Sequence, residues 1–330
     1  MKVGTINYAC NSGLGILVKE FYDNKILTDI LIVEHFKYPT FKKWYPNSKT
    51  ISYNNPDINI IEEYIKSIDI LFLFETPFSN NTIPLAKKYN KPVVIMPMYE
   101  WSPFPLDADL FLTPSQLDYD YYRRMYPDHK IINLPVPSNS NIKWQLKSKA
   151  INFTHNAGKN RHHDRNGTLK LIESLQYIKS PINLTIRGQN IDLPQVNDNR
   201  VKLVNEDIPF NKLWNDTDVF IFTERFNGLS LPLQEAHAAG CCIIAGDRYP
   251  INTWLPNNPL VRPTGQEKLM FVDSIPFLAD NYDAVDIANK IDEIHNTDIT
   301  KYSLAGKLWS ISNSWEVLGP RYLDLLNSLL

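Results

Sequence analysis

The residues whose types and spacing most clearly suit binding or catalysis follow a short apolar run, Val219–Phe222. They lie in a loop and in the turn after it. The loop Asn227–Ser230 is small and polar, and Pro232 favours the start of a helix there. Backbone N–H groups at such a helix start suit a diphosphate, and a carboxylate in the first turn can accept both hydroxyls of a ribose. Glu235 is therefore predicted to hold the ribose of a nucleotide. The alternative is that Glu235 only complements the helix dipole.

A second group of candidates is basic and lies between a predicted strand at 151–154 and a predicted helix at 167–178. Its members are Lys159, Arg161, His162, His163 and Arg165. Fixed cations in such a loop can bind a phosphate and, without a metal ion, stabilise negative charge that develops on it. The alternative is a solvated basic loop, and the two histidines are expected to be surface residues.

The loop and helix around Glu235 resemble the Glu-x7-Glu segment of retaining GT-B glycosyltransferases of family 4, commonly Glu-Gly-Phe-Gly-Leu-Pro-x-x-Glu-Ala. This chain reads Asn227-Gly228-Leu229-Ser230-Leu231-Pro232-Leu233-Gln234-Glu235-Ala236. The second glutamate of the motif is present, whereas Asn227 takes the place of the first. Further segments match in the expected order: Phe153–Ser174, Leu184–Gly188 and Trp315–Leu330.

This resemblance implies two Rossmann-like domains that face a crevice, with the closing helix crossing back to the first domain. It places Lys159 and Arg165 at the diphosphate as catalytic residues, and Gly188 in a turn beside the donor. In the family the first acidic residue contacts the donor sugar, so Asn227 puts the donor's identity in question. The implied co-substrate is a nucleotide-sugar, with UDP the default nucleotide; no metal and no other cofactor is expected.

The first half of the chain offers a glycine loop, Asn11–Gly15, between a predicted strand at 3–8 and a predicted helix. Its N–H groups can approach a phosphate or a sugar. The dinucleotide fingerprint needs a third glycine, where this chain has Val18. Gly13 and Gly15 are therefore candidate donor-binding residues only through the GT-B resemblance.

Two glutamates, Glu75 and Glu100, follow predicted strands of the first half. Either can orient or deprotonate an acceptor hydroxyl. In a retaining enzyme the departing phosphate itself can take that proton, which lessens the need for a base. Glu100 is retained as a candidate catalytic residue, and the alternative is a hydrogen-bonded loop carboxylate.

Alternating apolar runs and amphipathic stretches predict a doubly wound α/β fold in each half of the 330 residues. The predicted strands are 3–8, 30–33, 70–74, 92–96, 110–113, 131–134, 151–154, 182–187, 201–204, 219–222 and 242–245. The predicted helices are 15–22, 60–67, 82–89, 117–125, 167–178, 210–215, 231–239 and 284–295. The stretch 135–149 is predicted to be a linker, which gives an acceptor-binding domain at 1–138 with helix 316–330, and a nucleotide-sugar-binding domain at 139–315.

The composition excludes several classes of function. A net charge of −2 argues against binding to nucleic acid or anionic membranes through bulk electrostatics. No apolar stretch reaches the length of a signal peptide core or a membrane span, so a cytoplasmic protein without integral membrane association is expected. The three cysteines, two of them adjacent, do not suggest disulfides.

The sequence thus favours a hexosyl- or pentosyl-transferase that moves a sugar from a nucleoside-diphosphate sugar to a hydroxyl, with retention. Its acceptor stays open among a polysaccharide, a glycolipid, a protein and a hydroxymethyl-pyrimidine in DNA. The aromatic and basic segments 36–45 and 119–126 suit sugars or bases, or an ordinary surface. The alternatives are a nucleotide-sugar epimerase, through Glu75 and Glu100, and a non-catalytic sugar- or nucleotide-binding module.

Overall fold

The structure is a computed structural model that describes residues 1–35, 37–100, 102, 106–158, 162–189, 192–255, 257–271 and 275–330. The chain forms two compact units. Unit 1 comprises Met1–Pro137 and Ser314–Leu330, and unit 2 comprises Ser138–Asn313. The predicted pair of Rossmann-like α/β units is confirmed.

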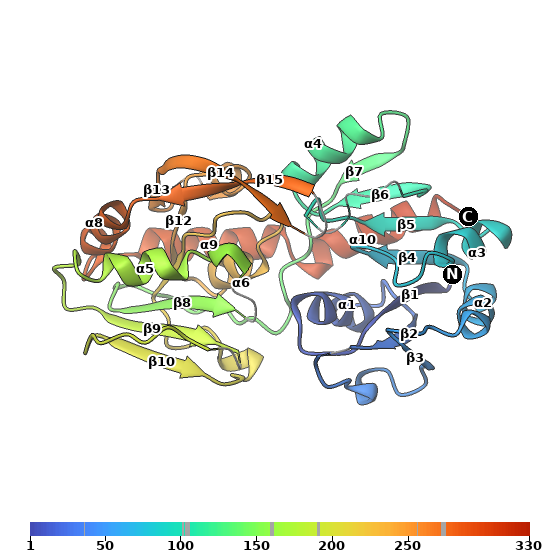
Figure 1. Ribbon diagram of the computed structural model, residues 1–330, viewed down its shortest axis with the longest axis horizontal. Helices are drawn as coiled ribbons and strands as arrows, with labels where there is room; N and C mark the ends of the chain where they lie inside the picture. Colours follow the sequence, from blue (N-terminus) through green and yellow to red (C-terminus); the bar gives the residue numbers. More distant parts are fainter. Residues whose placement is uncertain are drawn as a thin grey trace. The chain divides into compact units, whose positions relative to one another are not determined.

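Unit 1 is built on a parallel sheet with the strand order β3-β2-β1-β4-β5-β6-β7 (Figure 1). Its strands are β1 (Val3–Tyr8), β2 (Asp29–Glu34), β3 (Thr50–Ser52), β4 (Ile70–Phe74), β5 (Val93–Met96), β6 (Leu110–Thr113) and β7 (Ile131–Asn133). Its helices are α1 (Gly13–Asp23), α2 (Ile58–Ser67), α3 (Thr82–Lys88), α4 (Gln116–Met125) and α10 (Trp315–Asn327), with the short 3-10 helix η1 (Lys42–Trp44). The order reverses between β1 and β4, and parallel α/β sheets usually bind ligands at the carboxyl ends of such neighbours.

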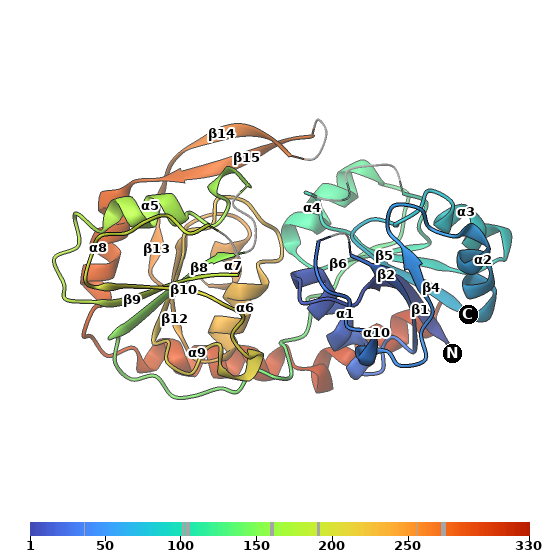
Figure 2. The same cartoon turned by 60° about the horizontal axis from the view of Figure 1, so that its bottom comes forward.

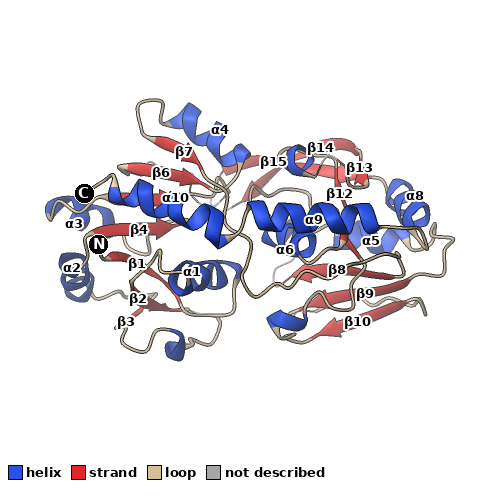
Figure 3. Ribbon diagram, turned by 180° about the vertical axis from the view of Figure 1, so that it is seen from behind, coloured by secondary structure: helices blue, strands red, loops and turns tan. Residues whose placement is uncertain are grey.

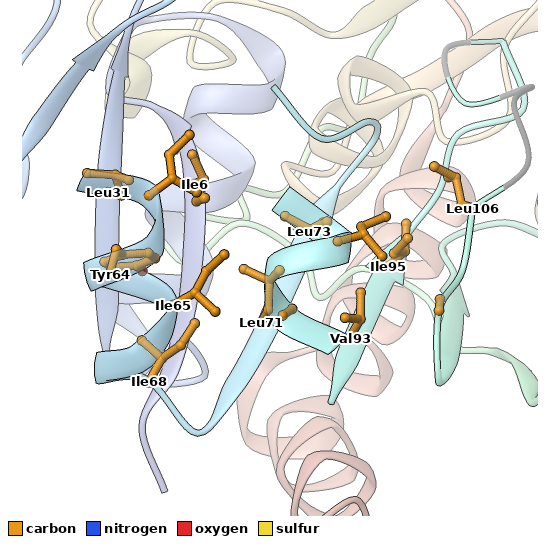
Figure 4. Close-up of a cluster of buried hydrophobic side chains, with 14 of the residues drawn as sticks. Ile6, Leu31, Tyr64, Ile65, Ile68, Leu71, Leu73, Val93, Ile95 and Leu106 are labelled. Carbon is orange, nitrogen blue, oxygen red and sulfur yellow. The ribbon is translucent and has the colours of Figure 1, made fainter. Parts of the chain in front are cut away.

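Burial explains the hydrophobic runs of this sheet. Every residue of β4 is buried, as expected for a central parallel strand covered on both faces. Helix α2 contributes Tyr64 and Ile65, and Ile68 follows directly after it; Figure 4 shows all three pointing toward the apolar side chains of the strands, among them Leu71. An amphipathic helix over a continuous apolar sheet face is thus the basis of the core.

The C-terminal helix α10 packs within unit 1, where Figure 3 shows it beside β4. The ring of Phe21, on α1, meets the rings of Trp315 and Tyr322 at centroid distances of 5.0 Å each. The hydroxyl of Tyr322 donates to the carbonyl oxygen of Leu134 at 3.1 Å. The last segment of the chain therefore completes the core of the first unit.

Unit 2 has a second parallel sheet, in the order β10-β9-β8-β11-β12-β13. Its strands are β8 (Asn152–Gly158), β9 (Asn183–Gly188), β10 (Val201–Asn205), β11 (Val219–Phe222), β12 (Cys242–Gly246) and β13 (Leu260–Val261). Its helices are α5 (Thr168–Ser174), α6 (Leu231–Ala238), α7 (Ile251–Trp254), α8 (Ala284–Ile294) and α9 (Thr300–Ser312), with the 3-10 helices η2 (His162–Asp164) and η3 (Phe210–Lys212). Here the order reverses between β8 and β11.

Unit 2 also carries an antiparallel hairpin, β14 (Pro263–Phe271) and β15 (Ile275–Tyr282) (Figure 2). The sequence analysis did not predict it, because its polar and charged residues lack the continuous apolar run of a buried strand. It also missed β3, β13, α7 and α9, and it predicted a full helix at 210–215 where the structure has the 3-10 helix η3. Short strands and weakly amphipathic helices owe their stability to tertiary packing, so their periodicity is faint.

Candidate nucleotide-binding site

The candidate site lies in unit 2 where the strand order reverses, because the loops after β8 and β11 meet there. The backbone N–H of Arg225, after β11, donates to the carbonyl oxygen of Arg165, after β8, at 2.8 Å. The Nε of Arg165 donates in return to the carbonyl oxygen of Phe226 at 3.2 Å. Its guanidinium also lies 5.3 Å from the centre of the Phe226 ring. One basic side chain is thereby fixed against the loop that precedes α6.

A close approach between the two loops requires a glycine at position 167. Gly167 has φ +73°, and a Cβ there would lie 2.4 Å from the carbonyl oxygen of Thr223. Any side chain would push the two loops apart. The sequence analysis gave this glycine no role beyond the start of a helix.

The loop before α6 is organised around Glu224, whose side chain is only 2% exposed. Its Oε1 accepts from the Nδ2 of Asn227 at 2.7 Å, and its Oε2 accepts from the Oγ of Ser230 at 2.8 Å. Two arginines pair with it: Arg248 at 3.3 Å and Arg165 at 3.8 Å. Both carboxylate oxygens thus have partners within the protein, as the cost of burying an unpaired charge requires.

Ser230 starts α6 in the left-handed conformation, with φ +51°, and its hydroxyl makes no capping bond to the helix. Because that hydroxyl is committed to Glu224, no side chain caps the start of α6. Pro232 has no N–H, and the N–H of Leu233 donates to the carbonyl oxygen of Ser230 at 3.1 Å. Among the first three residues of the helix, Leu231 is therefore the one whose N–H can face an anion. A helix start in this condition suits an anion. Since α6 begins at Leu231, Glu235 lies at its fifth residue, just past the first turn in which it was predicted. The Glu235 side chain is partly exposed.

Arg187, at the end of β9, was missed by the sequence analysis. It is 7% exposed, its Nη1 donates to the carbonyl oxygen of Leu213, and its guanidinium lies 4.9 Å from the centre of the Trp214 ring. Among the described residues, its Nε and Nη2 have no hydrogen-bond partner. Burial lowers the pKa of Arg187 to about 10, and the negative charge of Glu235 opposes that shift. Alternation along β9 places Arg187 on the face of Asn183 and Thr185, opposite the buried Leu184 and Ile186, so no signal in the sequence indicates its burial.

The other predicted residues of unit 2 fall in the same region of the fold. Gly188 ends β9, and Gly228 and Leu229 are buried in the loop before α6. Asn227 is partly buried. Lys159 lies outside the described residues.

In unit 1 the glycine loop follows β1, beside the reversal of strand order. Ser12 caps α1 by accepting from the N–H of Gly15 at 3.1 Å. A Cβ on Gly15 would lie 2.1 Å from the carbonyl oxygen of Cys10, whereas a Cβ on Gly13 would meet nothing within 4 Å. Packing alone thus requires the glycine at position 15, and Gly13 is exposed.

Glu100 is 4% exposed and lies near a second buried carboxylate, Asp118. Asp118 accepts from the backbone N–H of Tyr99 at 2.9 Å and pairs with the hydroxyl of Ser115. Burial, together with the charge of Glu100, raises the pKa of Asp118 to about 7. Glu75 has φ +60°, an unusual conformation for a residue with a side chain.

The residues that the structure describes hold no group of histidine, cysteine, aspartate and glutamate side chains suited to a metal ion. No helix among them has the length and apolar character needed to cross a membrane.

Comparison with known proteins defines the class of fold. No protein-family model matches the chain, and no curated protein matches it. A glycosyltransferase from Rickettsia africae is 16% identical with a TM-score of 0.71, covering 99% of this chain and 98% of its own. Anabaena HepE (Alr3699), in complex with UDP and glucose, is 12% identical with a TM-score of 0.69 and coverages of 99% and 100%. Sucrose-phosphate synthase from Thermosynechococcus elongatus is 13% identical with a TM-score of 0.68 and coverages of 100% and 99%.

These structures are GT-B glycosyltransferases, and the match extends over both units. The chain therefore has the GT-B fold. At such low identities the likeness establishes the fold alone, so the activity is argued from the site.

Proposed function

We propose that this protein is a glycosyltransferase that binds a UDP-sugar in unit 2 and transfers the sugar to a hydroxyl acceptor. The observation that carries the proposal is the meeting of the loops after β8 and β11. It places Arg165 and the uncapped start of α6 at one edge of the sheet, with Glu235 in the same helix. Cation, backbone N–H groups and carboxylate are the groups that a nucleoside diphosphate requires. The solved complex of HepE with UDP-glucose supports UDP as the nucleotide.

Each part of the donor has a proposed contact. Glu235 accepts hydrogen bonds from the ribose hydroxyls, and the N–H groups of the loop Asn227–Ser230 and of Leu231, at the start of α6, bind the diphosphate. Arg165, with Lys159 as predicted from the sequence, stabilises the charge that develops on the leaving phosphate. The loop Asn227–Ser230 contacts the donor sugar. No metal ion is needed in this arrangement.

Unit 1 is proposed to bind the acceptor, a hydroxyl on a polysaccharide, glycolipid, protein or modified pyrimidine. Retention of configuration is proposed because the departing phosphate can take the acceptor's proton. Glu100 is the candidate side chain for orienting the acceptor. Its burial beside Asp118 suits an orienting role better than free exchange of protons with solvent.

Thermal unfolding in the presence of nucleotides tests the proposal. UDP and UDP-glucose at a hundred times their dissociation constants are expected to add about 2.7 kcal/mol of apparent stability. Glu235→Gln should weaken UDP binding at least tenfold, whereas Glu173→Gln, an exposed carboxylate on α5, should not. If no uridine, guanosine or adenosine diphosphate stabilises the protein, a nucleotide-sugar function is ruled out. Interconversion of free nucleotide-sugars without an acceptor would instead indicate an epimerase.

A further inference from the structure

Two departures from the motif in the loop before α6 belong to one hydrogen-bonded unit, which is centred on Glu224. Compared with the motif quoted above, the chain has asparagine for glutamate at 227 and serine for glycine at 230. Both side chains donate to the same buried carboxylate, Glu224, at 2.7 Å and 2.8 Å. The two substitutions therefore have a common physical cause, the negative charge at position 224.

Hydrogen-bond chemistry fixes which end of the Asn227 side chain faces outward. An ionised carboxylate only accepts, so the Nδ2 of Asn227 must point to Glu224. Its Oδ1 then points the other way, and no described residue donates to it in the hydrogen bonds of this loop. Asn227 thus presents a neutral acceptor where the motif presents a carboxylate. A glutamate there would set two carboxylates against each other.

The charge of Glu224 is balanced inside the protein. Arg248, with a side chain 5% exposed, pairs with it and also donates to the backbone carbonyl oxygens of Glu224 at 3.1 Å and Asn227 at 2.8 Å. Arg165 adds the second cation. Arg248 therefore holds both the side chain and the backbone of the loop, and the unit is rigid at the point where the sugar would lie.

We propose that Glu224 is a positioning residue for the donor sugar. Through Asn227 it presents an uncharged acceptor to a hydroxyl of that sugar, and through Ser230 it fixes the start of α6. This inference rests on the proposed function, because it deepens the role of the same site. At this point of the site a hydroxyl of the donor sugar then donates its hydrogen bond to the amide oxygen of Asn227 and not to a carboxylate.

The test compares UDP with UDP-sugars by isothermal titration calorimetry. Asn227→Asp places a carboxylate beside Glu224 and is expected to lower the affinity for the better-bound of UDP-glucose and UDP-galactose at least tenfold. The affinity for UDP should change less than twofold. In the double variant Glu224→Gln with Asn227→Asp, the glutamine amide can donate to the new carboxylate, and the UDP-sugar affinity is expected to recover to within threefold of the wild-type value.

Ser230→Gly tests the second hydrogen bond to Glu224, and Glu293→Gln is the matched control. Glycine accepts the positive φ of position 230 without strain, so Ser230→Gly should fold and lose about threefold in UDP-sugar affinity only. Glu293→Gln removes an exposed carboxylate on α8 and should change neither affinity. Equal losses for UDP and UDP-sugar in Asn227→Asp, or no recovery in the double variant, would overturn the positioning role while leaving the proposed function intact. Failure of wild-type protein to bind UDP would overturn both.

Discussion

At the scale of single residues, the buried charged side chains of unit 2 give the clearest information about its candidate site. Glu224 and Arg248 pair at 3.3 Å with side chains 2% and 5% exposed. Removing one partner of such a pair leaves an uncompensated buried charge, which is strongly destabilising. Arg187 differs, because two of its nitrogens have no partner among the described residues although it is buried. Glu235 lies close enough for its negative charge to oppose the lowering of the Arg187 pKa by burial.

Arg187→Met is expected to maintain stability or to raise it by about 1 kcal/mol. A methionine keeps the packing against Trp214 and removes N–H groups whose burial without partners costs about 1–3 kcal/mol each. The same variant should weaken UDP binding threefold to tenfold, because it withdraws a positive charge near Glu235 and the proposed nucleotide site. Urea denaturation and calorimetry measure the two effects. A large loss of stability with unchanged UDP affinity would contradict the prediction.

His155 should make unit 2 sensitive to acid. Its Nδ1 lies 2.9 Å from the carbonyl oxygen of Ile221, and its Nε2 lies 2.8 Å from the hydroxyl of Thr168. Both nitrogens of the neutral ring therefore have a hydrogen-bond partner. Burial, with the charge of Arg187, lowers the pKa of His155 to about 4. The unfolded state then binds more protons below pH ~6.5, and stability is lost as the pH falls from about 6.5 toward 4.

His155→Gln should remove about 2 kcal/mol of the stability difference between pH 7.5 and pH 5. Urea denaturation at both pH values measures this. His237, whose pKa burial also lowers to about 4, should retain its own acid sensitivity in the variant. An unchanged pH dependence in His155→Gln would show that His155 is protonated in the folded protein near its ordinary pKa.

At the scale of elements, each loop at a reversal of strand order depends on one glycine. Gly15 allows α1 to begin against the carbonyl oxygen of Cys10, and Gly167 allows the loop after β8 to touch Thr223. Neither position resembles a phosphate-binding fingerprint. Gly15 is required by the tight turn from β1 into α1, and Gly167 by the close approach of the loops after the neighbouring strands β8 and β11.

Gly15→Ala and Gly13→Ala form a matched pair in the same loop. The first should cost about 2–3 kcal/mol, because the new methyl group meets backbone that cannot move without disturbing β1. The second should change stability by less than about 0.5 kcal/mol, since a Cβ at Gly13 enters open space. Chemical denaturation compares them. Equal effects would mean that Gly15 is not confined as the geometry indicates.

At the scale of the whole molecule, unit 1 is discontinuous in sequence. Helix α10 buries Trp315, Leu318, Tyr322 and Leu326, each less than 8% exposed. Each such side chain contributes roughly 2 kcal/mol. Their sum is comparable to the 5–15 kcal/mol that stabilises an ordinary domain.

Removal of residues 314–330 is therefore expected to unfold unit 1 and to spare unit 2. Differential scanning calorimetry should show the transition of unit 1 lost and one transition kept, and UDP should raise the temperature of the transition that is kept. Tyr322→Ala is a milder change than the truncation. It is expected to lower the free energy of unfolding of unit 1 by about 3–5 kcal/mol and to leave unit 2 unchanged. A truncated chain that keeps both transitions would show that α10 is dispensable.

Much of the sheet framework could be predicted from the sequence because parallel strands buried on both faces are continuous apolar runs. The runs at β1, β4, β6 and β11 coincide with the observed strands. The hairpin β14–β15 could not be found in this way. It is held by contacts distant in sequence, such as those of Arg225 with Glu267 and with Asn281 at 2.8 Å.

The sequence by itself determined the two doubly wound sheets, the loop before α6 and the candidate carboxylate at position 235, because local periodicity and turn chemistry encode them. Only the tertiary structure decided the state of Glu224 and Arg187. Burial and partners set the role of an ionisable side chain, and those partners come from the loops after β8, β11 and β12 and from the segment that follows η3. Segments this far apart in the sequence meet only when the sheet has formed.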